Sequence, residues 1–193
     1  MAKRSRVATR QTEFKVFGPF KLQCHKGSTA LDPIRSEQAV IADIRKRYPN
    51  DRLDEKGGCY VFAIRTGGRA ARGGAYLPWY VGKAVRSALI DESLSSRNFA
   101  QHYVGVAAKT HGSPVLFWIA KAAPGMAKSL NVIEIGRMEK ELIAWAAHRN
   151  RQLLNKHHNT ALAFRIEGVP LTAQSHPRAR RGPAAMLAKM LEV

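Results

Sequence analysis

The chain has 193 residues, 45% of them hydrophobic, so one compact domain is expected and a disordered protein is excluded. It carries 32 Lys and Arg against 14 Asp and Glu, a formal net charge of +18. So large an excess favours a polyanionic partner, with nucleic acid ahead of an anionic membrane. The longest strongly apolar run, residues 115–120, is too short to cross a bilayer, which argues against a membrane partner.

The two cysteines, Cys24 and Cys59, show no paired spacing, which argues against a disulfide framework and a structural zinc site. The amino terminus has a basic start with no apolar segment behind it, so it does not look like a secretory signal. We therefore expect a reducing, cytoplasmic or nucleoid-associated protein.

The amino-terminal part divides into a flexible basic arm, residues 1–12, and an extension, residues 13–56. The extension begins with two short apolar runs around Gly18-Pro19, which predict a hairpin or a bent strand. A helix follows from Asp32-Pro33, because apolar residues then recur at helical spacing.

The main domain is expected over residues 57–170, followed by a basic tail, residues 171–193, that ends in a short amphipathic stretch. Its expected elements, in chain order, are strands over 58–64 and 76–81, a helix over 85–106, a strand over 115–120 and a helix over 131–150. This order predicts an α+β fold, with a small mixed three-stranded central sheet flanked by helices.

One carboxylate on the last of these helices is out of place. At 100° per residue, one face of the helix is apolar, formed by Ile135, Met138, Leu142, Trp145 and Ala146. Glu139 falls inside this face, whereas Glu134 and Glu141 fall outside it. A carboxylate that faces a core must be paired or bound to metal, so Glu139 is either a metal ligand or one half of a salt bridge to an arginine.

Two short motifs on the expected strands give this glutamate a context. They are Gly58-Cys59-Tyr60 and Tyr80-Val81-Gly82-Lys83. The pair resembles the two tripeptides that name the GIY-YIG superfamily of endonucleases. Downstream, residues 139–143 resemble the family's metal-binding helix, residues 153–155 its closing asparagine, and His102-Tyr103 the end of its first core helix. The resemblance covers about residues 57–156.

The resemblance implies a catalytic set. Glu139 would hold one Mg²⁺ or Mn²⁺ ion at the scissile phosphate, Tyr60 would act as or position the base, and Tyr80 would orient the water or the phosphate. The family also has an arginine on the first helix, but Ile90 stands at the usual spacing. Counting back from the end of that helix favours Arg97 as the group that neutralises the developing charge, with Arg86 as the other candidate.

A second set is expected at the nucleic acid: Gly82, Lys83, Arg86, His102 and Asn155. Gly82 would let the phosphate backbone approach, Lys83 would contact a phosphate, and Asn155 would brace the site. These residues and the two motif tyrosines also have plainer interpretations. A strand-end glycine, a solvated lysine, a capping asparagine and tyrosines that pack a core are all common.

The leading hypothesis is a metal-dependent endonuclease, with DNA favoured over RNA as its substrate. The alternatives are a non-catalytic nucleic-acid-binding protein with a degenerate site, which the missing arginine spacing favours, and an RNA-directed nuclease. The basic arm, the loop rich in Gly and Arg after the first main strand, and the tail are expected to grip phosphates without reading bases. The sequence leaves the oligomeric state open.

Overall fold

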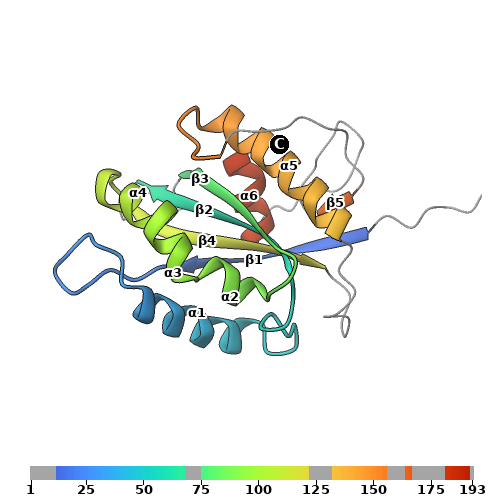
Figure 1. The fold of residues 1–193 in the computed structure, drawn as a ribbon, viewed down its shortest axis with the longest axis horizontal. Helices are drawn as coiled ribbons and strands as arrows, with labels where there is room; N and C mark the ends of the chain where they lie inside the picture. The colour runs from blue at the N-terminus through green and yellow to red at the C-terminus, as the bar shows by residue number, and fades with distance from the viewer. Residues whose placement is uncertain (1–11, 68–74, 122–131, 156–163, 167–180, 192–193) are drawn as a thin grey trace, which may run out of the picture.

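A computed structural model describes residues 12–67, 75–121, 132–155, 164–166 and 181–191 (Figure 1). The elements in chain order are β1 (Thr12–Lys21), α1 (Pro33–Arg47), β2 (Gly58–Thr66), β3 (Ala75–Ala84), α2 (Leu89–Ser93), α3 (Ser96–Asn98), the π-helical turn η1 (Phe99–Tyr103), α4 (Val104–Lys109), β4 (Ser113–Lys121), α5 (Val132–Arg149), β5 (Phe164–Ile166) and α6 (Gly182–Leu191). The fold is α+β. Among the described helices, none has the length and apolar character needed to cross a bilayer.

The sheet has five strands in the order β3-β2-β4-β1-β5. The β3-β2, β2-β4 and β4-β1 pairs are antiparallel, and β5 runs parallel to β1. The three strands expected from the sequence form the β3-β2-β4 half. The expectation of a three-stranded sheet was wrong, because β1 from the amino-terminal extension pairs with the second edge of β4, which would otherwise present unpaired backbone groups.

The first part of the extension is a single bent strand and not a hairpin. The register against β4 slips between Phe17 and Phe20, where three steps along β1 match two along β4. The bend lies at Gly18, whose φ of +105° suits glycine, and a Cβ there would lie 2.8 Å from the carbonyl oxygen of Leu116. The extension therefore lies in the main sheet through β1.

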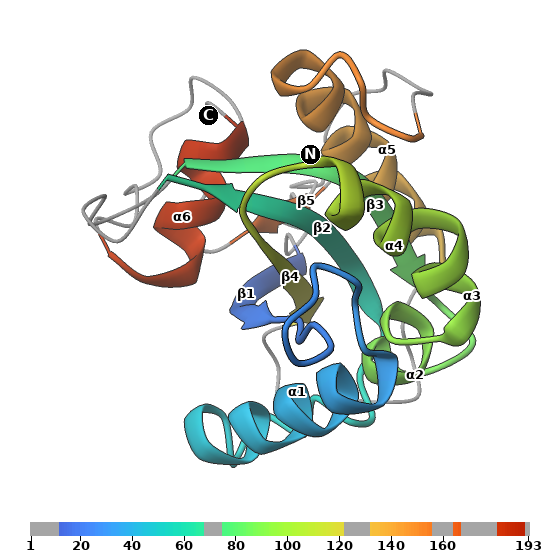
Figure 2. The same ribbon diagram turned by 90° about the vertical axis from the view of Figure 1, so that its left-hand side faces the viewer.

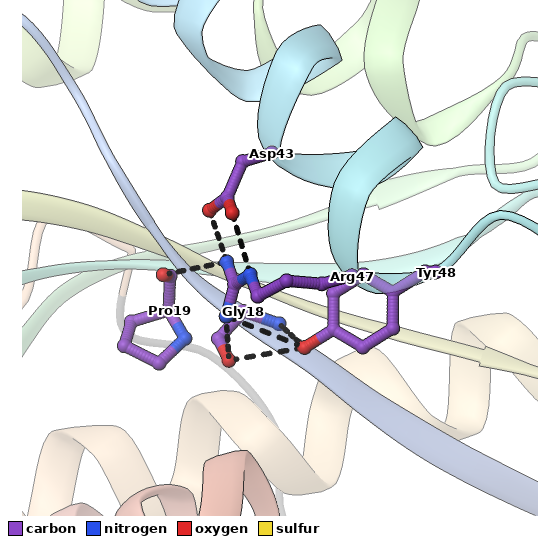
Figure 3. A network of polar contacts seen from close by, with 5 residues as sticks. All are labelled: Gly18, Pro19, Asp43, Arg47 and Tyr48. Carbon is purple, nitrogen blue, oxygen red and sulfur yellow. Dashed lines mark hydrogen bonds and ion pairs between the residues drawn. The ribbon is translucent and has the colours of Figure 1, made fainter.

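Helix α1 is fixed against this bend by Arg47 (Figure 3). Asp32 caps the start of the helix by accepting a hydrogen bond from the backbone nitrogen of Arg35. At the other end, Arg47 pairs with Asp43 and donates to the carbonyl oxygens of Gly18 and Pro19, each at 3.2 Å. One guanidinium thus ties the last turn of α1 to the backbone of β1.

The helices cover both faces of the sheet (Figures 1 and 2). On one face, the buried side chains of α5 and α6 pack against β2, β3 and β4, in a cluster that contains Val61, Phe117 and Met138. On the other face, α1, α2, η1 and α4 pack over a cluster that contains Phe62, Tyr103 and Trp118. The sheet lies between these two layers, and β3 is one of its two edge strands, with β5 at the other edge.

The single helix expected over residues 85–106 is broken into α2, α3, η1 and α4. The break after α2 has a local cause. Ser95 adopts extended backbone, with φ of −60° and ψ of 145°, and its hydroxyl accepts a hydrogen bond from the backbone nitrogen of Asn98 at 3.3 Å. Such a serine ends one helix and starts the next.

The end of the expected basic tail belongs to the core. Leu187, Ala188, Met190 and Leu191 of α6 are buried, and α6 packs against β3, β1 and α5. Most of the expected phosphate-gripping segments lie outside the described residues: residues 1–11 of the basic arm, residues 68–74 of the loop rich in Gly and Arg, and residues 171–180 of the tail.

Candidate functional site

The outer edge of β3 is completed by the segment that follows α5, residues 150–155. The side-chain amide of Asn150 donates to the carbonyl oxygen of Pro78 at 2.7 Å. The backbone nitrogen of Leu154 donates to the carbonyl oxygen of Trp79 at 2.9 Å. Asn155 accepts from the backbone nitrogen of Val81 at 3.2 Å and donates to its carbonyl oxygen at 2.5 Å. The structure thus places Asn155 as a brace of β3.

The two motif tyrosines lie side by side on neighbouring strands. Tyr60 pairs with Gly82 and Phe62 pairs with Tyr80, so both tyrosines lie on the face covered by α2, η1 and α4. Their ring centroids are 6.1 Å apart. Tyr60 is fully buried, whereas Tyr80 is partly exposed.

Gly82 lets these aromatics fit. A Cβ at this position would lie 2.2 Å from Cζ and 2.3 Å from the hydroxyl oxygen of Tyr60, which leaves no space for a side chain. The glycine of the second motif therefore has a packing reason, the close approach of the Tyr60 ring. Its expected role at a phosphate stays a prediction.

Asn98 holds the Tyr60 hydroxyl, and the sequence did not point to it. Its side-chain nitrogen donates to the Tyr60 hydroxyl at 2.8 Å and to the carbonyl oxygen of Glu92 at 2.6 Å. Asn98 is buried, with 4% of its surface exposed. No local signal marks this residue, because its partner lies 38 residues earlier in the chain.

The two hydroxyls differ in their acid–base character. Burial is the main cause that raises the pKa of Tyr60 well above its ordinary value of 10, and the neighbouring Tyr80 and Glu92 raise it further. Burial also raises the pKa of Tyr80, and the charges of Glu139 and Glu92 act in the same direction, whereas the neighbouring Tyr60 and the charge of Arg97 act to lower it. Tyr80, which is the more exposed hydroxyl, is therefore the better placed of the two to lose a proton.

The π-helical turn η1 brings His102 to Tyr80. The backbone nitrogen of Val104 donates to the carbonyl oxygen of Phe99, which closes a wider turn than that of an α-helix. Arg97 lies just before this turn, in α3. The His102 ring stacks on Tyr80, with centroids 3.9 Å apart and planes 13° apart. Burial and the charge of Arg97 lower the pKa of His102, which favours the neutral imidazole.

The two candidate arginines are not equivalent. Arg97 is exposed, donates to the side-chain oxygen of Gln101 at 3.2 Å, and affects the pKa values of both Tyr80 and His102. Arg86 is also exposed, and within the described ranges it makes no hydrogen bond or ion pair with the tyrosines or with Glu139. Of the two, Arg97 is therefore the arginine whose charge acts on Tyr80 and His102.

Glu139 lies opposite Lys83, across the gap between α5 and β3. The Lys83 ammonium is 2.6 Å from Oε2 of Glu139, and the Glu139 side chain retains 17% of its exposure. The negative charge of Glu139 also raises the pKa of Tyr80, after the larger effects of burial and of the neighbouring Tyr60. Glu139 thus acts electrostatically on Tyr80.

The interpretation of the neighbouring glutamate was wrong. Glu141, expected outside the buried face, is only 7% exposed, and burial raises its pKa. Its Oε1 atom has no hydrogen-bond partner among the residues described. The structure therefore buries a second flank of α5 that the helical pattern did not show.

Glu139 offers one carboxylate to a hard cation, and its Oε2 atom is paired with the Lys83 ammonium at 2.6 Å. One carboxylate is a donor set that suits Mg²⁺, which commonly binds through one or two carboxylates together with waters and substrate phosphates. Within the described ranges there is no cluster of three or more His, Cys, Asp and Glu side chains that would form an all-protein cage. No protein-family model, curated protein or solved structure matches this chain.

Proposed function

We propose that the protein is a metal-dependent endonuclease, with its active site at the outer edge of β3. The observation that supports this most is the convergence on Tyr80. Its ring stacks on His102, its ring centroid lies 6.1 Å from that of Tyr60, and its pKa responds to Arg97 and Glu139. These residues come from four separate segments of the chain, and they supply a base, a cation and a carboxylate, as hydrolysis of a phosphodiester requires.

The tyrosines have unequal roles in this proposal. Tyr80 is the general base, because it is the more exposed of the two hydroxyls, and the neighbouring Tyr60 and the charge of Arg97 both act to lower its pKa against the larger effect of burial. Tyr60 is a positioning residue, since Asn98 fixes its hydroxyl and burial keeps that hydroxyl protonated. Arg97 is exposed at the same place and would neutralise charge on the phosphate in the transition state.

Glu139 is the residue that would hold Mg²⁺ or Mn²⁺. The ion, when bound, supplies charge neutralisation at the scissile phosphate and at the departing oxygen. Lys83 lies at the oxygen that the ion would use, so its ammonium must move when the carboxylate takes up metal. The Lys83 side chain is 41% exposed, so its freed ammonium is then available to a phosphate oxygen of the substrate.

DNA is the proposed substrate, because the chain is strongly basic and the motifs resemble those of DNA endonucleases. A second candidate, a binding protein without catalysis, is favoured by the Lys83–Glu139 ion pair, which would occupy the carboxylate permanently in a degenerate site. The same assay, run on DNA and on RNA, distinguishes a nuclease that cleaves RNA from one that cleaves DNA.

The test is a nicking assay on supercoiled plasmid with Mg²⁺, Mn²⁺ or EDTA, repeated on a labelled RNA. Wild type is compared with Glu139→Gln, and with Glu37→Gln as a matched control on the exposed surface of α1. We expect nicking in the presence of metal, its loss in EDTA, and a decrease of at least about 100-fold in Glu139→Gln alone.

Retention of plasmid on a gel without any cutting, by wild type and both variants, would favour the binding protein. Equal cutting by wild type and Glu139→Gln would contradict the placement of the metal. Cutting of RNA and not of plasmid would keep the site and change the substrate.

A further inference from the structure

A groove runs beside the candidate site, between α4 and the segment that follows α5. Its volume is about 590 Å³, within the range of about 300–1,000 Å³ that small ligands occupy. Its lining residues are Trp79, Gln101, His102, Gly105, Val106, Lys109, Thr110, His111, Gln152 and Leu154. We call it the α4 groove. It meets the site at His102, whose ring stacks on Tyr80.

The floor of the α4 groove contains Trp79, which a β-bulge presents there. In the pairing of β2 with β3, Phe62 faces Tyr80 and Ala63 faces Pro78, so Trp79 is the additional residue. A bulge turns a side chain away from the regular alternation of a strand, and Trp79 packs on the same face as Tyr80. The aromatic residue and the proposed base are thus neighbours in sequence and on one face of the sheet.

The chemistry of the lining suits a nucleobase. Trp79 offers a flat aromatic ring and Leu154 an apolar side chain, and 47% of Leu154 is exposed. Gln101 and Gln152 carry amides that can donate and accept at the edge of a base. Lys109 adds positive charge, and no lining residue is acidic within the described part of the chain. Aromatic and apolar side chains combined with a basic rim are typical of sites for unpaired bases.

A base within a duplex cannot enter such a groove, because both of its faces are stacked on its neighbours. We propose that the α4 groove binds one unpaired nucleobase of the substrate, next to the scissile phosphate. This inference rests on the proposed function and specifies its substrate. The substrate is nucleic acid with a single-stranded, displaced or bulged nucleotide at the cut. The position of the groove against the His102–Tyr80 stack sets the base beside the proposed chemistry.

The test measures binding in EDTA with the Glu139→Gln protein, so that cutting does not enter. The probes are a labelled short oligothymidylate and an oligomer of the same length made of abasic deoxyribose phosphate. Both carry the same charge, and only one has bases. We expect about tenfold tighter binding of the oligothymidylate, and quenching of tryptophan fluorescence by it alone.

A groove variant and its control sharpen the result. Leu154→Asn replaces an exposed apolar side chain of the groove, and Ile34→Asn makes the same kind of change at a residue of α1 that is 69% exposed. The preference for bases should decrease at least about threefold in Leu154→Asn and stay unchanged in Ile34→Asn. Equal binding of both probes, or an unchanged preference in Leu154→Asn, would overturn the proposal.

The two proposals fail in different ways. A preference for bases without plasmid nicking by the wild type would keep the α4 groove as a base site and remove the nuclease. Nicking without any preference for bases would keep the nuclease and remove the base site.

Discussion

Two tyrosines that look equivalent in the sequence are chemically different in the fold. Tyr60 is enclosed and receives a hydrogen bond from Asn98, whereas Tyr80 lies at the edge strand near Arg97. The resemblance alone favoured Tyr60 as the base or its positioner. The burial of Tyr60 favours Tyr80 as the base, because a fully buried phenolate would lose solvation that no described cation replaces.

This assignment predicts a pH dependence of cutting. The active form of a base is deprotonated, and the pKa of Tyr80 is raised above 10, so the active fraction is small at neutral pH. The rate should therefore increase about tenfold per pH unit between roughly pH 7 and 9. Single-turnover cutting by wild type, Tyr80→Phe and Tyr76→Phe measures it, and Tyr76 is a matched control on the same strand.

Tyr80→Phe should lose most of its rate together with the slope, while Tyr76→Phe keeps both. A slope that persists in Tyr80→Phe would assign the proton to another group. A flat profile in wild type would mean that proton transfer does not limit the rate.

At the scale of elements, the sequence predicted what depends on local pattern. The β2, β3, β4 and α5 segments were all predicted at nearly their observed bounds, since apolar runs and helical spacing mark them directly. The pairing of β1 with β4 was not predicted, because it joins segments about 100 residues apart that share no pattern. Burial of Glu141 was missed for a similar reason, since a helical wheel shows the face that packs on a sheet and not what covers its flank.

The same division holds in the candidate site. The two motifs and Glu139 could be found from the order of residues along the chain, and the structure brings them together. Asn98 could not, because only the packing of α3 against β2 gives its amide a partner. The β-bulge at Trp79 was also hidden, since it arises from the register between β2 and β3.

The contact between β2 and β3 gives a second prediction. Gly82→Ala would set a methyl group 2.2 Å from the buried Tyr60 ring, which cannot move without displacing Asn98. The free energy of unfolding should decrease by about 1–3 kcal/mol. Gly136→Ala on α5 is the control, because a Cβ there meets nothing within 4 Å and alanine favours a helix.

Urea unfolding followed by circular dichroism measures both variants. Gly136→Ala should be unchanged or more stable by up to about 1 kcal/mol. If Gly82→Ala were as stable as wild type, the close approach of Tyr60 would not be the reason for glycine at this position.

At the scale of the whole molecule, α6 closes the layer that carries Glu139. The helix is the end of the expected basic tail, yet its side chains complete the cluster that holds α5 on the sheet. The sequence predicts that the arginines of this tail grip phosphates. The structure shows that the last part of the tail is a helix packed in the core.

Removal of residues 182–193 should therefore destabilise the protein. Burial of Leu187, Met190 and Leu191 contributes about 1.5–3 kcal/mol for each side chain, a large share of a total stability of about 5–15 kcal/mol. The thermal midpoint should fall by about 10 °C or more. Replacement of Arg178, Arg180 and Arg181 by Gln should leave the midpoint unchanged and weaken DNA binding, with a smaller dependence on salt.

Thermal unfolding and DNA binding across a salt series measure the two effects on separate proteins. A truncated chain with an unchanged midpoint would show that α6 is dispensable, and the tail would then act on binding alone. An arginine variant that binds as tightly as wild type at every salt concentration would remove these side chains from the interface. Because α6 packs on the helix that carries Glu139, the truncation should reduce cutting through stability, whereas the arginine variants reduce it only through affinity.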